Sequence, residues 1–200
     1  KTFPAFPERS EFDIYAVLEP AKEVGGDFYD FFFIDQTHLC FVIGDVVGKG
    51  VPAALFMAMT KTLLKTTAKE NVNPDEVLNK VNKEISYENS SCMFITIFCA
   101  VLDTKSGELY YTNAGHNPPF LCRSANKPQF LSGGKSSAIG IDEDSVFKKD
   151  NLTLQPGDTI LMYTDGITEA FNASGEQFLE EGLINELLLL QKEPVIGLVK

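Results

Sequence analysis

The order of strand-like and helix-like segments along this 200-residue chain is the feature that most restricts its fold. Strand-like segments come first, two consecutive helices follow, further strands come next, and a single helix ends the pattern. Because strands do not alternate with helices, this order argues against a doubly wound parallel sheet. The expected strands cover residues 12–18, 27–34, 39–43, 93–102, 108–114, 120–123, 146–154 and 159–164, the last two forming one pair around the turn 155–158. The expected helices cover residues 51–67, 74–85 and 177–190, and residues 127–137 are expected to be a loop.

Two of the strand-like runs, around Phe41 and Phe98, are almost continuously apolar. Such runs are typical of strands that are covered on both faces. The chain is therefore expected to be α+β, with two packed antiparallel β-sheets flanked by helices in an α-β-β-α sandwich. No repeat of fixed period interrupts the sequence, and we expect one domain over residues 1–200.

Composition removes several classes of function. The net charge of −11 argues against nucleic acid as a partner, because domains that bind nucleic acids usually carry a basic patch. The longest apolar run, residues 93–102, is shorter than the roughly 20 residues that a membrane span requires. Charged residues near the start argue against a signal peptide. The four cysteines (Cys40, Cys92, Cys99 and Cys122) form no CxxC pair and are expected to be reduced core residues, which favours a cytoplasmic location.

Three aspartates are expected to lie where strands end, and each has a glycine beside it: Asp27, Asp45 and Asp165. Carboxylates gathered in one pocket would repel each other and resist burial unless a cation neutralised them. Mg²⁺ and Mn²⁺ prefer such oxygen ligands. The alternative for each position is a simple Asp-Gly turn, but three such positions after apolar strands favour a metal site.

Other catalytic chemistries fit the sequence less well. A cysteine phosphatase needs an arginine shortly after its cysteine in a loop, whereas Cys122 meets its arginine inside an expected strand. The two histidines, His38 and His116, are not accompanied by a GxSxG motif, which argues against a serine hydrolase. Residues 133–136 lack the upstream glycine of a P-loop, and residues 48–53 match GxGxxA but precede a helix where a dinucleotide fold needs a second strand.

Six segments of the chain, taken together and in order, resemble the motifs of the PPM-type phosphatases of the SpoIIE/RsbU branch. The resemblance covers nearly the whole chain, and its most specific later motif is Tyr-Thr-Asp-Gly-Ile-Thr-Glu-Ala. The segments are residues 24–30, 43–54, 93–96, 113–119, 154–158 and 163–170.

This resemblance implies a centre of two Mn²⁺ or Mg²⁺ ions at one edge of the β-sandwich. Asp45 would bridge the ions, the backbone carbonyl of Val46 would bind one of them, and Asp165 would bind from a separate strand. Asp27 would act as the first motif's acidic ligand, directly or through water. The reaction implied is hydrolysis of phosphoserine or phosphothreonine on a protein by metal-activated water, without a covalent intermediate.

Three further residues have open roles within these motifs. Asp30 could be a surface residue or could orient a metal-bound water. His116 is expected to hydrogen-bond the backbone of its own tight loop, with a general-acid role as the lesser alternative. Lys49 is expected to be structural or solvated, although its place between glycines leaves a phosphate contact open.

The resemblance also implies a further aspartate on a late strand, and no aspartate follows Asp165. We therefore expect a catalytic domain truncated at both ends, with one of its two metal positions weak. The implied partners are a phosphoprotein, specifically an anti-sigma-factor antagonist, and a sensor domain on the N-terminal side. Two alternatives are an inactive binding module, disfavoured by the intact Asp45 and Asp165, and a Ca²⁺-binding domain at residues 142–144, which lack EF-hand spacing.

Overall fold

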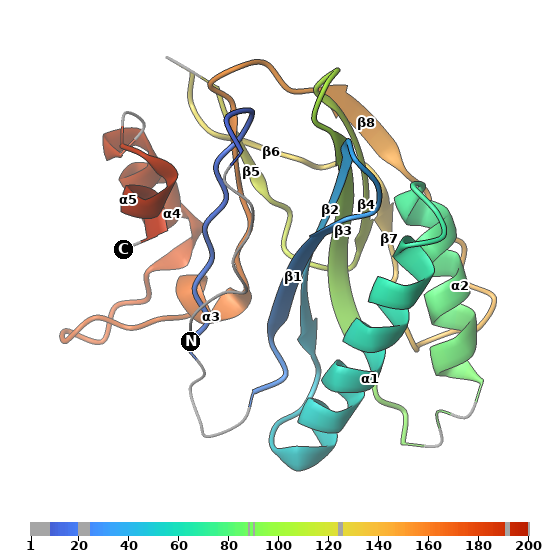
Figure 1. Ribbon diagram of the computed structural model, residues 1–200. Coiled ribbons are helices and arrows are strands. Elements are labelled where there is room, and N and C mark those ends of the chain that lie inside the picture. The colour runs from blue at the N-terminus through green and yellow to red at the C-terminus, as the bar shows by residue number, and fades with distance from the viewer. Residues whose placement is uncertain are drawn as a thin grey trace.

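The computed structural model describes residues 9–19, 25–87, 89, 91–123, 126–190 and 193–199, and its elements form four layers (Figure 1). Helices α1 (Val51–Ala68) and α2 (Pro74–Ser86) cover one sheet, and α4 (Leu179–Leu189) and α5 (Val195–Val199) lie beyond the other. The expected α+β sandwich of two sheets flanked by helices is confirmed.

The two sheets differ in size. The larger has the order β1-β2-β3-β4-β7, with β8 also paired to β4, and the smaller has the order β6-β5-β9. The larger sheet consists of β1 (Phe28–Phe33), β2 (His38–Val46), β3 (Ile95–Asp103), β4 (Glu108–Ala114), β7 (Lys135–Ser136) and β8 (Asp150–Thr153). The smaller sheet consists of β5 (Phe120–Cys122), β6 (Gln129–Phe130) and β9 (Thr159–Leu161). All pairs are antiparallel except β4 with β7.

Three clusters of buried apolar side chains fill the three interfaces between the layers. The first lies between the larger sheet and its helices and includes Leu78 of α2. The second lies between the sheets, where Phe98 of β3 meets Leu121 of β5. The third joins the smaller sheet to α4 through Phe120 and Leu187. Adjacent residues of β5 thus serve different clusters, as the alternation of side chains along a strand requires.

Strand β2 shows why an almost continuous apolar run indicates a strand covered on both faces. Cys40 and Val42 belong to the cluster under the helices. Leu39 and Phe41 belong to the cluster between the sheets. All four are buried, so the expectation drawn from this run is confirmed.

Both expected helix starts on this side of the molecule are confirmed. Helix α1 begins at Val51, with Pro52 in its first turn, where a missing backbone N–H costs nothing. Helix α2 begins at Pro74 after the N-cap residue Asn73. No capping box forms at this start, because the Asn73 side chain donates to Glu76 Oε1 at 3.0 Å and makes no capping hydrogen bond.

The expected hairpin of residues 146–154 with 159–164 is wrong. Strand β8 pairs with β4 in the larger sheet, whereas β9 pairs with β5 in the smaller one. The turn between them carries the chain from one sheet to the other. A turn signal identifies a reversal of the chain but not which strand each side then meets.

Two other segments also differ from expectation. Residues 12–18 do not form a strand, although Phe12 packs on Phe33 with ring centroids 6.2 Å apart. Residues 127–137 contain the two-residue strands β6 and β7 within the expected loop.

The cysteines largely meet expectation. Cys40 and Cys99 are buried and Cys122 is half-buried, but Cys92 is exposed and lies outside any strand. Among the described residues, no helix has both the length and the apolar character needed to cross a membrane.

Truncating Phe98 tests whether the cluster between the sheets stabilises the fold. The side chain is fully buried and stacks on Tyr111, so Phe98→Ala should lower the free energy of unfolding by about 3–5 kcal/mol. The matched control is Phe171→Ala, at a side chain that is 69% exposed, and it should change stability by less than about 0.5 kcal/mol. Urea denaturation measures both, and equal losses would contradict this assignment of the core.

Candidate metal centre

Asp27 and Asp45 are brought together by the register of the β1–β2 pair. Phe28 lies opposite Gly44, so the next position along the same antiparallel ladder places Asp27 opposite Asp45. Phe28 and Val46 pack under the helices, and the alternation of side chains therefore directs the two aspartates toward the other sheet. Asp45 lies near the end of β2 as expected, whereas Asp27 immediately precedes β1 and does not follow a strand.

The Asp27 and Asp45 carboxyl groups form a hydrogen-bonded pair. Burial, followed by the hydrogen bond and charge of Asp27 and the charge of Asp165, raises the pKa of Asp45 to about 7. Thr164 Oγ1 donates a hydrogen bond to Asp27 Oδ2 at 2.9 Å. Without a cation, Asp45 therefore tends to stay protonated near neutral pH, and its O–H donates a hydrogen bond to Asp27.

Asp165 approaches from the side of the smaller sheet. Strand β9 ends at Leu161, and Asp165 is the first residue of the short helix α3 (Asp165–Thr168), with Thr164 as its N-cap. It therefore does not lie at a strand end, contrary to expectation. Its side chain is exposed, yet its charge contributes to the raised pKa of Asp45. Asp27, next to the larger sheet, and Asp165, which follows the smaller sheet, thus both contribute to the raised pKa of Asp45.

The last residue of β2, Val46, places its backbone carbonyl oxygen against Gly26, the residue before Asp27. A side chain at Gly26, just before the first aspartate, would meet the carbonyl oxygen of Val46 at 2.8 Å from its Cβ. Glycine is therefore needed for this close approach. Gly48 and Gly50 have φ angles of 116° and 82°, so they allow a sharp turn after β2, and Lys49 between them is exposed.

The donor groups fit a hard divalent cation, although no complete cage is formed. Within the described parts of the chain, no three His, Cys, Asp or Glu side chains are grouped so that they could hold a metal ion. Asp27 and Asp45 are in contact, and Asp165 acts on Asp45 through its charge. Oxygen ligands suit Mg²⁺ or Mn²⁺, and a cation would offset the burial and the neighbouring negative charges that raise the pKa of Asp45.

His116 does not hydrogen-bond its own loop through its side chain, so that expectation is wrong. Asn113 holds the loop instead, because its Oδ1 accepts from the His116 N–H at 2.8 Å and its Nδ2 donates to the His116 carbonyl at 3.0 Å. The His116 ring lies 2.9 Å from Thr96 Oγ1 through Nδ1 and 3.2 Å from the Tyr163 carbonyl through Nε2. Burial lowers the pKa of His116 to about 4.

Three polar residues of the centre carry no individual signal in the sequence: Thr96, Asn113 and Thr164. Threonine and asparagine are common on surfaces and in turns, so their types alone do not indicate a site. Each lies inside one of the six motif segments, and that position is the signal that could have identified them.

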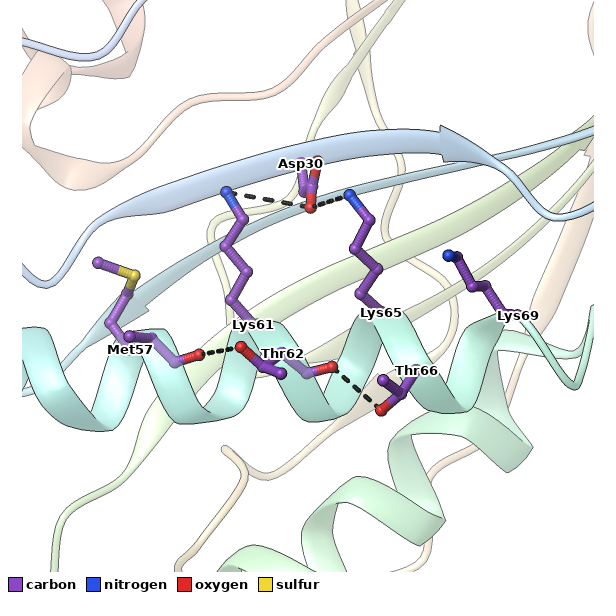
Figure 2. Close-up of a pocket in the computed structure, with 8 residues that line it drawn as sticks. Asp30, Met57, Lys61, Thr62, Lys65, Thr66 and Lys69 are labelled. Carbon is purple, nitrogen blue, oxygen red and sulfur yellow. Dashed lines mark hydrogen bonds and ion pairs between the residues drawn. The ribbon is translucent and has the colours of Figure 1, made fainter. Parts of the chain in front are cut away.

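Asp30 lies outside the centre, on the opposite face of β1, which argues against the water-orienting role and agrees with the alternative of a surface residue. Its Oδ2 is 3.0 Å from Lys65 Nζ and 4.0 Å from Lys61 Nζ, and both lysines extend from α1 across the edge of the sheet (Figure 2). Lys61 also donates to the Tyr29 carbonyl at 2.9 Å. Asp30 is three residues beyond Asp27 and therefore projects from the opposite face of β1. Its ion pairs with the two lysines join the edge strand β1 to α1.

The arrangement of elements is shared with solved phosphatase domains. A structure of the RsbU and RsbW domains of a Mycobacterium tuberculosis protein superposes with a TM-score of 0.77 and 27% identity, covering 90% of this chain and 50% of that one. The SiaA-PP2C domain of Pseudomonas aeruginosa superposes with a TM-score of 0.75 and 21% identity, covering 87% of this chain and 70% of that one. The fold is thus that of PP2C-type phosphatase domains.

Residues 35–198 match the family model described as Stage II sporulation protein E (SpoIIE), and the chain belongs to that family. Phosphoserine phosphatase RsbU of Bacillus subtilis is 32% identical over 182 residues, which are 91% of this chain and 53% of that protein. The chain spans between a third and about half of the length of three curated relatives that it matches. Phosphatases of this family are metal-dependent, and RsbX has been solved in complex with magnesium (TM-score 0.67, 17% identity, covering 92% of this chain and 81% of that one).

The buried imidazole gives a measurable dependence of stability on pH. The folded-state pKa of His116, about 4, lies below the ordinary 6.5, so the unfolded chain takes up the proton first as pH falls. The stability contribution is fully present above pH 6.5 and is lost between pH 6.5 and 4, by at most about 3 kcal/mol. His116→Gln cannot titrate, so the difference in unfolding free energy between wild type and variant should shrink over that range. A constant difference from pH 7 to pH 4 would contradict the assignment.

Proposed function

We propose that this chain is a metal-dependent phosphatase that hydrolyses phosphoserine or phosphothreonine on a regulatory protein. The observation that carries the proposal is the pairing of Asp27 with Asp45 at one edge of the sandwich, with Asp165 near enough for its charge to help raise the pKa of Asp45 to about 7. Evolved proteins seldom gather like charges in a fold unless a cation or a reaction requires them. Membership of the SpoIIE family supports the same conclusion.

Each residue has a distinct task in this proposal. Asp45 would be the ligand that the ions share, because both Asp27 and the charge of Asp165 act on it. The Val46 carbonyl, which lies against Gly26, adds a neutral oxygen. A pair of Mn²⁺ or Mg²⁺ ions held by these groups would supply an activated water and neutralise phosphoryl charge. A phosphate monoester therefore needs no protein nucleophile.

The identity of the substrate protein is inferred from the relatives. RsbU of Bacillus subtilis is named a phosphoserine phosphatase, and the Mycobacterium tuberculosis structure contains RsbU and RsbW domains. We infer a small phosphoprotein of a sigma-factor switch, an anti-sigma-factor antagonist, as the substrate. A sensor domain on the N-terminal side would regulate the reaction, and the setting would be the cytoplasm.

Neutralising Asp45 tests the metal requirement. Wild type should hydrolyse a fluorogenic phosphate ester in Mn²⁺ or Mg²⁺ and lose activity in chelator. Asp45→Asn should lower kcat by at least about 10³-fold, because a bridging charge is lost. Its unfolding free energy in chelator should be equal to or above that of wild type, because the variant removes one repelling carboxylate. The control Asp144→Asn, at an exposed carboxylate, should leave kcat unchanged. Full activity of wild type in chelator would refute the proposal, and so would an Asp45→Asn variant as active as wild type.

The number of acidic ligands sets an expectation for metal stoichiometry. Asp27, Asp45 and Asp165 are three carboxylates for two ions, and each anionic ligand adds affinity. Calorimetry on these 200 residues should therefore give one tighter Mn²⁺ site and a second that is at least about tenfold weaker. Two equally tight sites would contradict this expectation. Asp30 could not then supply the missing ligand, since it is paired with Lys65.

A further inference from the structure

The two halves of the proposed metal centre belong to different sheets. Asp45 lies on β2 in the larger sheet, whereas Asp165 follows β9 of the smaller sheet. A cation shared by both carboxylates requires the sheets to keep a fixed separation at this edge. Apolar packing between sheets is not directional, so a hydrogen-bonded connection is the more precise way to fix that separation.

His116 lies in the segment that crosses between the sheets. It follows β4 of the larger sheet and precedes β5 of the smaller one. Its side chain is only 5% exposed. The reciprocal hydrogen bonds of Asn113 to the backbone of His116 fix the loop, so the ring is placed before any ligand binds.

The protonation state of the ring follows from its two partners. The Tyr163 carbonyl can only accept, so Nε2 carries the hydrogen and donates it across 3.2 Å. In a neutral ring Nδ1 then accepts, and the Thr96 hydroxyl donates to it across 2.9 Å. One side of the imidazole is thereby attached to β3 and the other to the chain leading into α3.

Both attachment points are next to the acidic residues. Thr96 lies directly opposite Asp45 in the β2–β3 ladder, and its Oγ1 is 3.4 Å from the Asp45 carbonyl oxygen. Tyr163 is two residues before Asp165, and the residue between them, Thr164, donates to Asp27. The hydrogen bonds of His116 thus connect the two acid-bearing segments at positions where a small displacement would move a carboxylate.

We propose that His116 is a positioning residue that holds the Asp165 segment against the Asp45 strand, so that carboxylates from both sheets face the same cation. This inference rests on the proposed metal-dependent function. Residues that hold metal ligands without touching the metal typically change affinity or activity by about 10–100-fold when they are replaced.

Two substitutions test the two hydrogen bonds of the His116 ring separately. His116→Asn keeps an acceptor near Thr96 but is too short to reach the Tyr163 carbonyl. His116→Gln keeps a donor for that carbonyl and loses the aromatic ring. The control is Asn79→Ala, which removes a comparable pair of partly buried hydrogen bonds, those between Asn79 and Phe147 of 3.0 and 3.3 Å. That pair joins α2 to a loop and lies outside the metal centre.

Three measurements separate positioning from general stability. Mn²⁺ affinity is measured by calorimetry, turnover with a fluorogenic phosphate ester, and backbone order by hydrogen exchange at the Ile167 and Glu169 amides, which donate to the Thr164 and Asp165 carbonyls of α3. His116→Asn should lower Mn²⁺ affinity and kcat about tenfold or more and speed exchange at both amides in metal-free protein. His116→Gln should recover most of each loss, and Asn79→Ala should change none of the three beyond about twofold.

The outcomes are distinguishable from failure of the proposed function. If wild type hydrolyses no phosphate ester but His116→Asn still loosens α3, the positioning role stands and the enzymatic proposal fails. If wild type is active and His116→Asn matches it in Mn²⁺ affinity and exchange, the positioning inference is overturned. Equal losses in His116→Asn and Asn79→Ala, or in His116→Asn and His116→Gln, would also overturn it.

Discussion

The burial of neighbouring carboxyl groups, together with the repulsion between them, is the constraint on which the rest of this structure depends. Asp27 and Asp45 share a hydrogen bond at the end of the β1–β2 ladder, and the charge of Asp165 adds to their unfavourable interaction. Such a group does not stabilise the metal-free fold. The free energy that holds it together must therefore come from elsewhere, and the three apolar clusters between the layers are the source.

The architecture determines where this repulsion is located. The cluster between the sheets, with Phe98 at its centre, sets their separation. The crossing from β8 to β9 moves the chain from one sheet to the other, and the segment after β9 then delivers Asp165 to the edge that carries Asp45. A hairpin in place of that crossing would leave all the acidic groups on one sheet. The topology of the two sheets, more than any single loop, therefore creates the centre.

The sequence predicts those features that depend on local periodicity and fails where the chain must choose a partner. The apolar run of β2 and the Pro74 helix start follow from side-chain alternation and from the missing N–H of proline. The different positions of Asp27 and Asp30 could also have been predicted, because residues three apart on a strand face opposite ways. The partners of β8 and the contacts of His116 could not, since they depend on segments tens of residues distant.

The chemistry of His116 shows why a neutral group suits this position. A lysine or arginine could also donate to the Tyr163 carbonyl, but its charge would attract the carboxylates and compete with a cation for them. The imidazole has one donor and one acceptor on opposite sides, so it can join two segments without a net charge. The negative charge of Asp27 tends to raise the pKa of His116, yet burial outweighs it and the ring stays neutral at pH 7. Burial of the histidine therefore preserves the negative potential that a divalent cation needs. The packing that fixes the separation of the sheets also keeps the His116 ring uncharged.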